Sequence, residues 1–555
     1  MNKFLLLSLL TLLFITVSAQ VTDNERRAVE TVVNHFQNVA TKIGYSNSDF
    51  EQLIITDVYT SKHNNVTHVY LRQQHNGIEV YSANANANVW KDKVLNTGNQ
   101  FQYNLNRKIN NTSPAITAGQ AVEFAATHLK LTTKTFKSIE KKNDTAQGEV
   151  FSDAGISCDP IPARLVYQPI KEQKTIKLAW EVIIHQLNHE HWWSIRVDAQ
   201  TGEILDKNDW VVHCSFGGHD DNSCNNHIHQ NTLSNQIIVG KSNNKAQAAT
   251  NATVLANTYN VYPLPIESPS HGARAVVSAP WTAAGLAGTL GWHNDGATNY
   301  TIARGNNVYA QEDLNADDVV GYSPDGGATL DFNFPLNLNQ APSNYLDPAI
   351  TNLFYWNNIM HDIWYQYGFD EVSGNFQNDN QGRGGAQNDY VIADAQDGSA
   401  TNNANFSTPP DGSTPRMQMF EWSGGTFNFD SDLDNGIICH EYGHGISTRL
   451  TGGPSNASCL GNEEQMGEGW SDWLGLMLTL EAGDARNDVR GIGTYVIGQT
   501  TVGGGIRPAP YSTDFGVNSY TYAGSNAGVS VPHGVGFVWC TALWEMTWDL
   551  IDNYG

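Results

Sequence analysis

Residues 440–444 read HEYGH and residues 466–473 read MGEGWSDW, and these two stretches decide how the second half of the chain is expected to fold. Side chains four residues apart lie on one face of an α-helix, so His440 and His444 can direct ring nitrogens to the same metal ion. A second helix is expected to carry Glu468, which can reach that ion as a third ligand.

The residues around HEYGH favour a helix. Asp430, Asp432 and Asp434 place carboxylates where the free N–H groups of a first turn favour them. Residues 437–439 are Ile, Ile and Cys, which supply an apolar face, whereas Gly443 weakens the helix slightly.

Three protein ligands with one open position are typical of a catalytic zinc site, whereas structural sites are closed by four ligands. Bound zinc lowers the pKa of its water toward about 7, and Glu441 is predicted to take that proton as general base and pass it to the leaving amine. Asp472, one helical turn after Glu468, is expected to accept the other ring N–H of a ligand histidine. His533, in the stretch VPHGVGFVW, is the candidate donor to the developing oxyanion. The alternatives are an ordinary surface carboxylate for Asp472 and a loop histidine for His533.

The position of the third ligand separates two classes of zinc peptidase. Metzincins place a glycine and a third histidine shortly after the first two histidines. The corresponding positions here are Ser447 and Leu450, so that spacing is excluded. The third ligand must come from elsewhere, which favours Glu468.

Five stretches of the second half have a distinctive choice of residues, at 292–313, 351–371, 402–422, 440–460 and 466–473. They resemble the fungalysin family of secreted zinc metallopeptidases, which are relatives of thermolysin. The resemblance implies that His440, His444 and Glu468 bind zinc. It also implies that Glu441 is the catalytic acid and base, and that His533 is a donor to the transition state.

Asn405 falls where the thermolysin-like fold runs an edge strand along the substrate. The resemblance therefore implies that Ala404, Asn405 and Phe406 hydrogen-bond the peptide backbone. An ordinary turn at Asn405 is the alternative.

The N-terminus has the pattern of a signal peptide. Lys3 precedes an apolar run at 4–17, and the small residues at 17–19 suit cleavage before Gln20. That run is too short to span a membrane, and no later stretch has the uninterrupted apolar length of a transmembrane helix. The mature product is therefore expected to be secreted and extracellular.

Charge changes abruptly along the chain. Residues 251–555 hold 8 arginines, no lysine and 33 Asp+Glu, and so account for the whole net charge of −25. This charge argues against nucleic acid and anionic membranes as partners. A linker-like stretch at 243–253 marks the change, so we expect a removable prosegment before it and a mature enzyme after it. The expected parts are a signal peptide at 1–19, a first prosegment module at 20–110, a second module with linker at 111–250, and a zinc metallopeptidase catalytic domain at 251–555.

The first half is expected to fold as small α+β modules. A helix at 25–43 precedes a hairpin that turns at Asn76-Gly77. The second module is expected to contain a helix at 118–131 and strands at 178–185 and 192–197. This arrangement is similar to the propeptide modules of fungalysin and thermolysin, which implies a prosegment that acts as inhibitor and folding chaperone of its own enzyme. An independent binding domain is the alternative.

The fold class expected for the whole chain is α+β. The resemblance implies a two-lobed thermolysin-like catalytic domain, with a β-rich upper lobe, a helical lower lobe and zinc in the cleft. Aromatic spacing at 355–367 predicts a buried helix, with His361 as a core residue rather than a ligand. A last helix is predicted at 536–554. Fungalysin-like chains continue beyond this helix, so the catalytic domain is expected to be C-terminally incomplete.

Two further groups of residues have open interpretations. Cys214 and Cys224 favour a disulfide in an exported protein, although the histidines around them also permit a metal site. The carboxylates of the loop at 313–318 invite calcium, but Asp318 stands where the EF-hand pattern requires glycine. Calcium in another geometry and solvated carboxylates remain the two interpretations of this loop, whose polar residues are Asp313, Asn315, Asp317 and Asp318.

These observations predict a secreted zinc endopeptidase made as a zymogen, which hydrolyses peptide bonds of extended protein substrates. A zinc aminopeptidase would need a group that captures the free amine, and no such acidic motif stands out before HEYGH. A non-catalytic binding protein on a degenerate peptidase fold is the alternative from another class. The intact ligand set and Glu441 argue against it.

Overall fold

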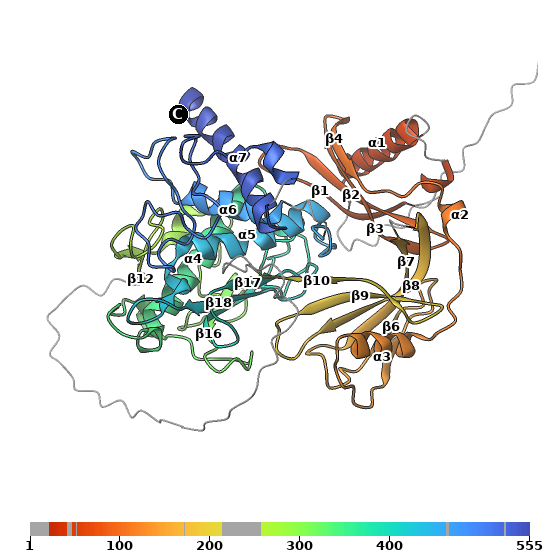
Figure 1. Ribbon diagram of the computed structural model, residues 1–555, viewed down its shortest axis with the longest axis horizontal. Helices are drawn as coiled ribbons and strands as arrows, with labels where there is room; N and C mark the ends of the chain where they lie inside the picture. The colour runs from red at the N-terminus through yellow and green to blue at the C-terminus, as the bar shows by residue number, and fades with distance from the viewer. Residues whose placement is uncertain are drawn as a thin grey trace, which may run out of the picture.

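The chain has the mixed α+β architecture expected from its sequence. Figure 1 shows two bodies side by side, the predicted prosegment (described from 21 to 213) in red to yellow and the residues from 257 onward in green to blue. The predicted signal peptide and the predicted Cys214–Cys224 pair lie outside the described residues. The computed structural model describes residues 21–40, 47–50, 53–170, 173–213, 257–461, 466–526 and 529–555.

One ten-stranded sheet runs through the prosegment. Its strands are β1 (Leu53–Thr60), β2 (Thr67–His75), β3 (Ile78–Trp90), β4 (Lys93–Asn99), β5 (Ser138–Lys141), β6 (Glu149–Phe151), β7 (Ile161–Ile170), β8 (Thr175–His185), β9 (Trp192–Asp198) and β10 (Ile204–Asp209). The main path is β1-β2-β3-β7-β8-β9-β10. A short parallel contact between β3 and β7, with Val80 opposite Tyr167, joins the two halves of the prosegment.

Local sequence signals place the prosegment strands correctly. The hairpin predicted at Asn76-Gly77 is confirmed, because β2 and β3 pair antiparallel around it. Asn76 and Gly77 have φ of 50° and 76°, as a type I′ turn requires at both central positions. The strands predicted at 178–185 and 192–197 are present as β8 and β9.

Two helices lie over the prosegment sheet, and each covers an apolar core. Helix α1 (Asp23–Ala40) turns Ala28, Val32 and Phe36 onto β1 and β2. Helix α3 (Ala118–His128) packs on β7 and β8, and its first turn is closed by a capping box between Thr117 and Gln120. Both predicted helices are confirmed, although α3 ends three residues before the predicted end at 131. A short helix α2 (Leu105–Lys108) lies between them in the chain.

The second body contains two sheets. The larger one has the order β11-β17-β18-β16-β14, with β19 paired to β18, and the smaller one has the order β13-β12-β15. The strand β11 is the last described strand of the prosegment, so the larger sheet includes strands from both bodies. The bounds are β11 (Val211–His213), β12 (Thr258–Val261), β13 (Ala275–Ser278), β14 (Val308–Glu312), β15 (Asp331–Phe332), β16 (Val391–Asp397), β17 (Ala404–Ser407), β18 (Arg416–Trp422) and β19 (Phe429–Asp430).

The described residues of the second body form four α-helices, α4 (Leu346–Gln366), α5 (Asn435–Gly452), α6 (Gly467–Leu478) and α7 (His533–Tyr554). Helix α4 is buried along most of its length and packs against β14, β16 and α5. It confirms the buried helix predicted at 355–367 but begins earlier, because apolar residues such as Ile350 and Leu353 continue the buried face. Helices α5, α6 and α7 pack one against the next (Figure 1). Among the described helices, none has the length and apolarity needed to cross a membrane.

Candidate metal centre

Helix α5 carries both histidines of HEYGH and begins immediately after Asp434. The Asp434 side chain accepts a hydrogen bond of 3.3 Å from the Ile437 N–H, as expected of a first-turn carboxylate. The same expectation is wrong for Asp430 and Asp432, which precede the helix. Asp430 caps the short 3-10 helix at Ser431–Leu433 that comes before α5, where its carboxylate accepts from the Asp432 N–H at 3.0 Å. Asp430 and Asp432 also accept hydrogen bonds from the side chain and the backbone of Gln396, respectively.

Glycines allow three helices to meet at this site. A Cβ atom at Gly443 in α5 would lie 2.9 Å from Ser471 Oγ and 3.0 Å from Ser471 Cα in α6. A Cβ atom at Gly469 in α6 would lie 2.1 Å from the carbonyl oxygen of Gly536 in α7. Gly443 weakens the helix, but the absence of a side chain at this position allows α5 to pack closely on α6.

The structure brings the three predicted ligands together. His440 Nε2 lies 3.0 Å from His444 Nε2 and 3.3 Å from Glu468 Oε2, and His444 Nε2 lies 3.8 Å from Glu468 Oε1. All three side chains are buried. Nitrogen and oxygen ligands of one tetrahedral zinc ion lie about 3.3–3.5 Å apart, so the spacing and the donor types fit zinc.

Asp472 contacts the His440 ring nitrogen that does not face the other predicted ligands. Its Oδ1 lies 2.8 Å from His440 Nδ1, which leaves Nε2 directed at the other ligands. Arg507 donates to both Asp472 oxygens, at 2.7 and 2.8 Å, and reaches Glu468 at 3.4 Å, while Tyr511 donates to Asp472 at 2.6 Å. Although burial alone would raise it, the pKa of Asp472 is lowered by Arg507 and His440. Asp472 therefore stays ionised and keeps the His440 ring oriented.

His533 and Glu441 complete the group of predicted site residues. His533 is the first residue of α7, and its Nε2 lies 3.5 Å from Glu468 Oε1. Glu441 is fully buried on α5, directly after His440. Both residues thus lie on helices that also meet at the predicted ligands.

The predicted substrate strand exists as β17, which contains Ala404 and Asn405. In this structure β17 is not an edge strand, because β11 of the prosegment pairs with it antiparallel. Val212 lies opposite Phe406, and His213 lies opposite Asn405. The prosegment therefore occupies the backbone donors and acceptors that were predicted to bind a peptide.

Comparisons with known proteins agree with this geometry. A family model described as fungalysin metallopeptidase matches residues 258–555, and the fungalysin/thermolysin propeptide motif matches residues 51–101. The extracellular metalloproteinase mep of Aspergillus fumigatus is 36% identical over 519 residues, which cover 90% of this chain and 72% of that protein.

This chain belongs to the fungalysin family of metallopeptidases. Two further relatives are similar over comparable lengths. The extracellular metalloproteinase MEP of Fusarium vanettenii is 37% identical over 515 residues, which cover 90% of this chain and 71% of that protein. Extracellular metalloproteinase 10 of Coccidioides posadasii is 34% identical over 527 residues, which cover 94% of this chain and 75% of that protein. The resemblance stated from the sequence is confirmed.

Two side chains of this fungalysin's site, Arg507 and Tyr511, were not predicted from the sequence. They lie in the loop that follows α6, where neither periodicity nor a motif marks them. The one available signal is the scarcity of cations, because residues 251–555 contain only 8 arginines and no lysine. Each arginine there is a candidate partner for a buried carboxylate.

His361, which the sequence analysis left out of the site, is a core residue of α4. Its Nδ1 lies 2.9 Å from Asp362 Oδ1, and its Nε2 lies 3.3 Å from the Asn375 side-chain nitrogen. It is fully buried, and both ring nitrogens face polar partners. The interpretation of His361 as a packed histidine is confirmed.

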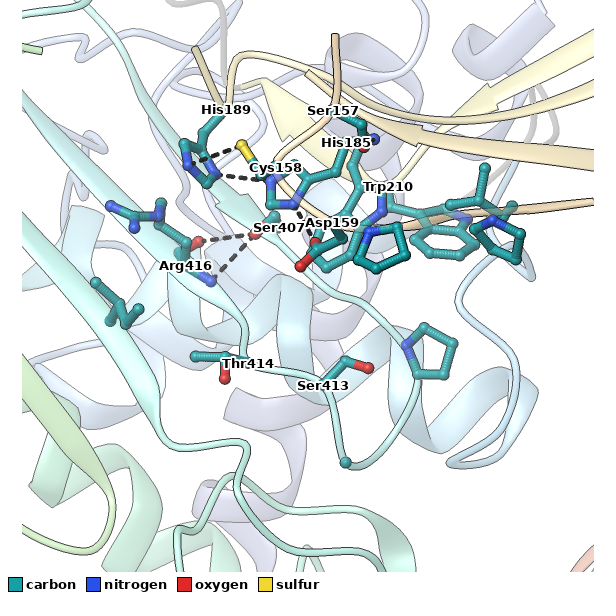
Figure 2. A pocket seen from close by; sticks show the side chains of 17 residues that line it. Ser157, Cys158, Asp159, His185, His189, Trp210, Ser407, Ser413, Thr414 and Arg416 are labelled. Atoms are coloured by element: carbon teal, nitrogen blue, oxygen red, sulfur yellow. Dashed lines mark hydrogen bonds and ion pairs between the residues drawn. The ribbon is translucent and has the colours of Figure 1, made fainter. Parts of the chain in front are cut away.

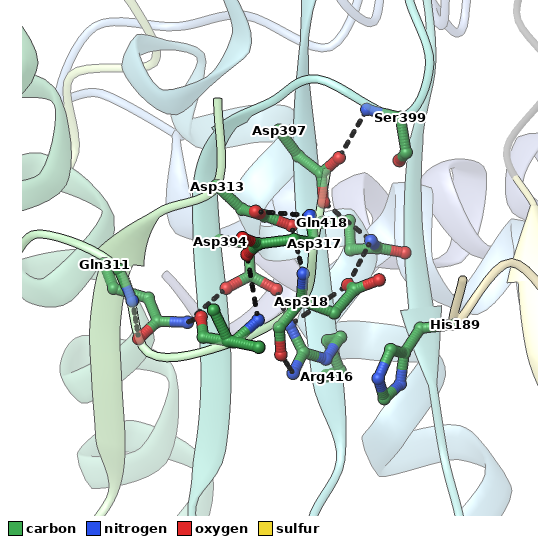
Figure 3. Close-up of polar contacts among 12 residues, drawn as sticks. His189, Gln311, Asp313, Asp317, Asp318, Asp394, Asp397, Ser399, Arg416 and Gln418 are labelled. Atoms are coloured by element: carbon green, nitrogen blue, oxygen red, sulfur yellow. Dashed lines mark hydrogen bonds and ion pairs between the residues drawn. The ribbon is translucent and has the colours of Figure 1, made fainter. Parts of the chain in front are cut away.

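The acidic loop predicted as a calcium candidate folds against β16 and β18 (Figure 3). Oxygens of Asp313, Asp318 and Asp397 lie within 4.8 Å of one another. Burial raises the pKa of Asp318 to about 8, because the neighbouring Arg416 offsets only part of its effect. Asn315 lies at the edge of the loop, 2.7 Å from an oxygen of Asp317, and calcium at this loop stays a prediction.

The metal-free centre of this fungalysin is expected to bind zinc less tightly as pH falls. Burial would lower the pKa of His440, but Asp472 and Glu468 raise it to about 9, whereas burial lowers the pKa of His444 to about 3. Below pH 9 zinc must therefore displace one proton, from His440, and its affinity should fall about tenfold for each pH unit. Competition with a fluorescent chelator between pH 8 and pH 6 measures the zinc affinity. The zinc that His444→Ala still binds is subtracted, because it is bound outside this centre. A constant affinity would contradict it.

Proposed function

We propose that His440, His444 and Glu468 hold the catalytic zinc ion of this fungalysin. The chain is a zinc metalloendopeptidase that is secreted and made as a zymogen. The observation that carries the ligand assignment is the convergence of three buried ligand atoms at 3.0–3.8 Å from two helices. When bound, zinc would supply Lewis acidity to water and to the peptide carbonyl.

Two side chains of the chain itself would handle the proton and the charge. Glu441 accepts the proton of the attacking water and passes it to the leaving amine, which is the role of a general base followed by a general acid. His533 donates a hydrogen bond to the oxygen on which negative charge develops. Burial lowers the pKa of His533, so it acts as a neutral donor rather than as an imidazolium.

The prosegment would inhibit the enzyme by covering the strand that binds substrate. β11 takes the place of an extended peptide beside β17, with main-chain pairing of the kind that recognises a substrate backbone. The contact extends to the end of α5, where Tyr70 and Arg72 donate to the carbonyl oxygens of Leu450 and Ser455 at 2.8 and 2.7 Å. Maturation must therefore remove a strand from the cleft as well as cut the chain.

The arrangement of lobes and the domain boundaries are also part of this proposal. The sheets of residues 257–430 would form the upper lobe, and α5, α6 and α7 would form the lower lobe, with an extended peptide in the cleft between them. The boundaries at 19, 110 and 250 are carried into the proposal as predicted. The boundary at 110 is supported by two apolar cores, one under α1 and β1–β3 and one centred on β7–β9 that also includes Ile78, Val80 and Ala83 of β3. The boundaries at 19 and 250 lie outside the described residues.

Metal removal with mapping of cleavage sites tests the function. We expect the mature enzyme to cut casein at internal bonds, a zinc-selective chelator to abolish the cleavage, and added zinc to restore it. N-terminally acetylated peptides separate the two classes of peptidase, because an aminopeptidase needs a free terminal amine. Mass spectrometry of the digest should show internal cuts in acetylated and free peptides alike.

The alternatives have their own outcomes in the same experiment. Stepwise release of single residues from free N-termini alone would assign an aminopeptidase. Intact casein after complete removal of the prosegment, in a sample that contains zinc, would favour a binding protein. Cleavage that survives loss of the metal would contradict the proposal.

A further inference from the structure

A second cluster of metal-binding side chains lies in the prosegment. Cys158, His185 and His189 each offer one ligand atom, and these atoms lie within 4.8 Å of one another. The three residues line a cavity of about 550 Å³, whose wall on the catalytic side includes Ser407 and Arg416. Figure 2 shows the thiol and the two imidazole rings gathered at this cavity.

The distances within the cluster suit a single small cation. His185 Nε2 lies 2.7 Å from His189 Nδ1, and Cys158 Sγ lies 3.3 Å from His189 Nε2. Nitrogen and sulfur ligands of one tetrahedral zinc ion lie about 3.3–3.6 Å apart. A shift of roughly half an ångström and a turn of the His189 ring would therefore bring the three ligands onto one zinc ion.

His185 is already oriented as a metal ligand. Asp159 Oδ2 lies 2.9 Å from His185 Nδ1, and the Trp192 ring stacks on the imidazole at 3.9 Å with an angle of 3° between the planes. A carboxylate on the second ring nitrogen fixes the tautomer and raises the basicity of the ligand nitrogen. Asp472 holds His440 in the same way at the catalytic centre, at 2.8 Å.

The backbone also pre-arranges the cluster. His185 is the last residue of β8, and His189 lies in the turn that leads to β9. The segment that carries Cys158 pairs with this turn, because Ser157 and Gln186 form a bridge and the Cys158 N–H donates to the His185 carbonyl oxygen at 2.8 Å. The ligands therefore come from two paired segments, and binding an ion costs little additional ordering.

The donor types select the metal. Thiolate and imidazole suit zinc, whereas calcium and magnesium prefer oxygen ligands. We propose that Cys158, His185 and His189 bind a second zinc ion in the zymogen, with a fourth position that faces the cavity. On binding, the thiol proton passes to solvent and the sulfur–zinc bond replaces the hydrogen bond of 3.2 Å that the thiol donates to the Gln186 carbonyl oxygen. The ion ties the β8–β9 turn to the segment at 157–160, on the face of the prosegment that covers β17 and β18.

The test uses the full-length zymogen with Glu441→Gln, so that the prosegment stays attached, and with Cys214→Ser and Cys224→Ser, so that these two thiols cannot bind the probe. Cobalt(II) replaces zinc as the probe, because thiolate ligation gives an intense near-ultraviolet charge-transfer band that histidine and glutamate ligands do not give. We expect this band in the parent zymogen and its loss in Cys158→Ser. After loading with zinc, the metal content should be one ion per chain lower in Cys158→Ser than in the parent zymogen. Asp159→Asn should weaken cobalt binding at this site about 10–100-fold, since it removes only the partner that orients His185.

Cys459 supplies a control thiol outside the proposed zinc site. Cys459→Ser alters a thiol that donates to the Thr448 carbonyl oxygen, and it should leave the band and the zinc content unchanged. A charge-transfer band that survives Cys158→Ser, or a parent zymogen with one zinc ion and no band, would overturn the second site. Failure of the catalytic assignment has a different signature, because His444→Ala would then leave the zinc content unchanged. The graded effect of Asp159→Asn separates loss of a ligand from loss of the fold.

Discussion

Replacing Glu441 with glutamine is expected to lower kcat/KM for casein by about 10²–10⁴-fold, the usual contribution of a positioned general base. Glutamine keeps the size of glutamate but cannot accept the proton of the attacking water. Glu441 is fully buried beside His440 and is not one of the three converging ligand atoms, so the zinc content should stay the same. Initial rates and metal analysis of the same sample measure both quantities.

A surface glutamate supplies the control for this variant. Glu545 on α7 makes a surface ion pair with Arg486 at 3.5 Å, so Glu545→Gln should keep the wild-type rate and change stability by less than about 0.5 kcal/mol. A normal rate in Glu441→Gln, with zinc bound, would show that the proton does not pass through this residue. Loss of zinc in Glu441→Gln would instead make it a ligand.

The proposed metal ligands could be predicted because helical spacing brings each pair of site residues to one side of its own helix. His440 and His444 are four residues apart, and Glu468 and Asp472 repeat that spacing on the next helix. Arg507 and Tyr511 come from a loop, whose path depends on packing against α6 and α7. No local sequence pattern predicts such residues. Only the folded chain shows that Asp472 contacts His440, Arg507 and Tyr511.

The fold divides in the same way between local and long-range causes. The turn at Asn76-Gly77 is set by its own residues and appears as the sequence predicts, and the helix predicted from 118 begins at a capping box that is equally local. The pairing of β11 with β17 joins segments almost 200 residues apart in the chain. It depends on unsatisfied backbone groups at a sheet edge, which a sequence does not display. Asp430 and Asp432 were wrongly predicted at the first turn of α5 for a related reason. Their partner Gln396 lies far away in the chain, on another strand.

Replacing Arg507 with methionine is expected to destabilise the metal-free zymogen by about 3–5 kcal/mol, the usual cost of removing one partner of a buried ion pair. Arg507 donates two hydrogen bonds to Asp472 and reaches Glu468 at 3.4 Å, and all three side chains are buried. Without the guanidinium, Asp472 no longer orients His440 firmly, so zinc affinity should also fall about 10–100-fold. Urea unfolding followed by tryptophan fluorescence and chelator competition measure the two effects, both in the Glu441→Gln background.

Graded variants and pH identify the cause of this loss. Arg507→Lys keeps a charge but not the two-bond geometry, so it should fall between wild type and Arg507→Met. Tyr511→Phe removes one hydrogen bond to a charged group and should cost about 1.5–3 kcal/mol.

In the wild type the pKa of Asp472 lies below its ordinary value of 3.8, so the stabilising effect of this carboxylate is complete above that value and is lost as pH falls through the lowered pKa. Arg507→Met removes the larger cause of the lowering and leaves that of His440, so the gap in stability between the two proteins should be full near neutral pH and should narrow as pH falls below 3.8. A gap that stays constant over this range would mean that the loss comes from altered packing rather than from an unpaired carboxylate.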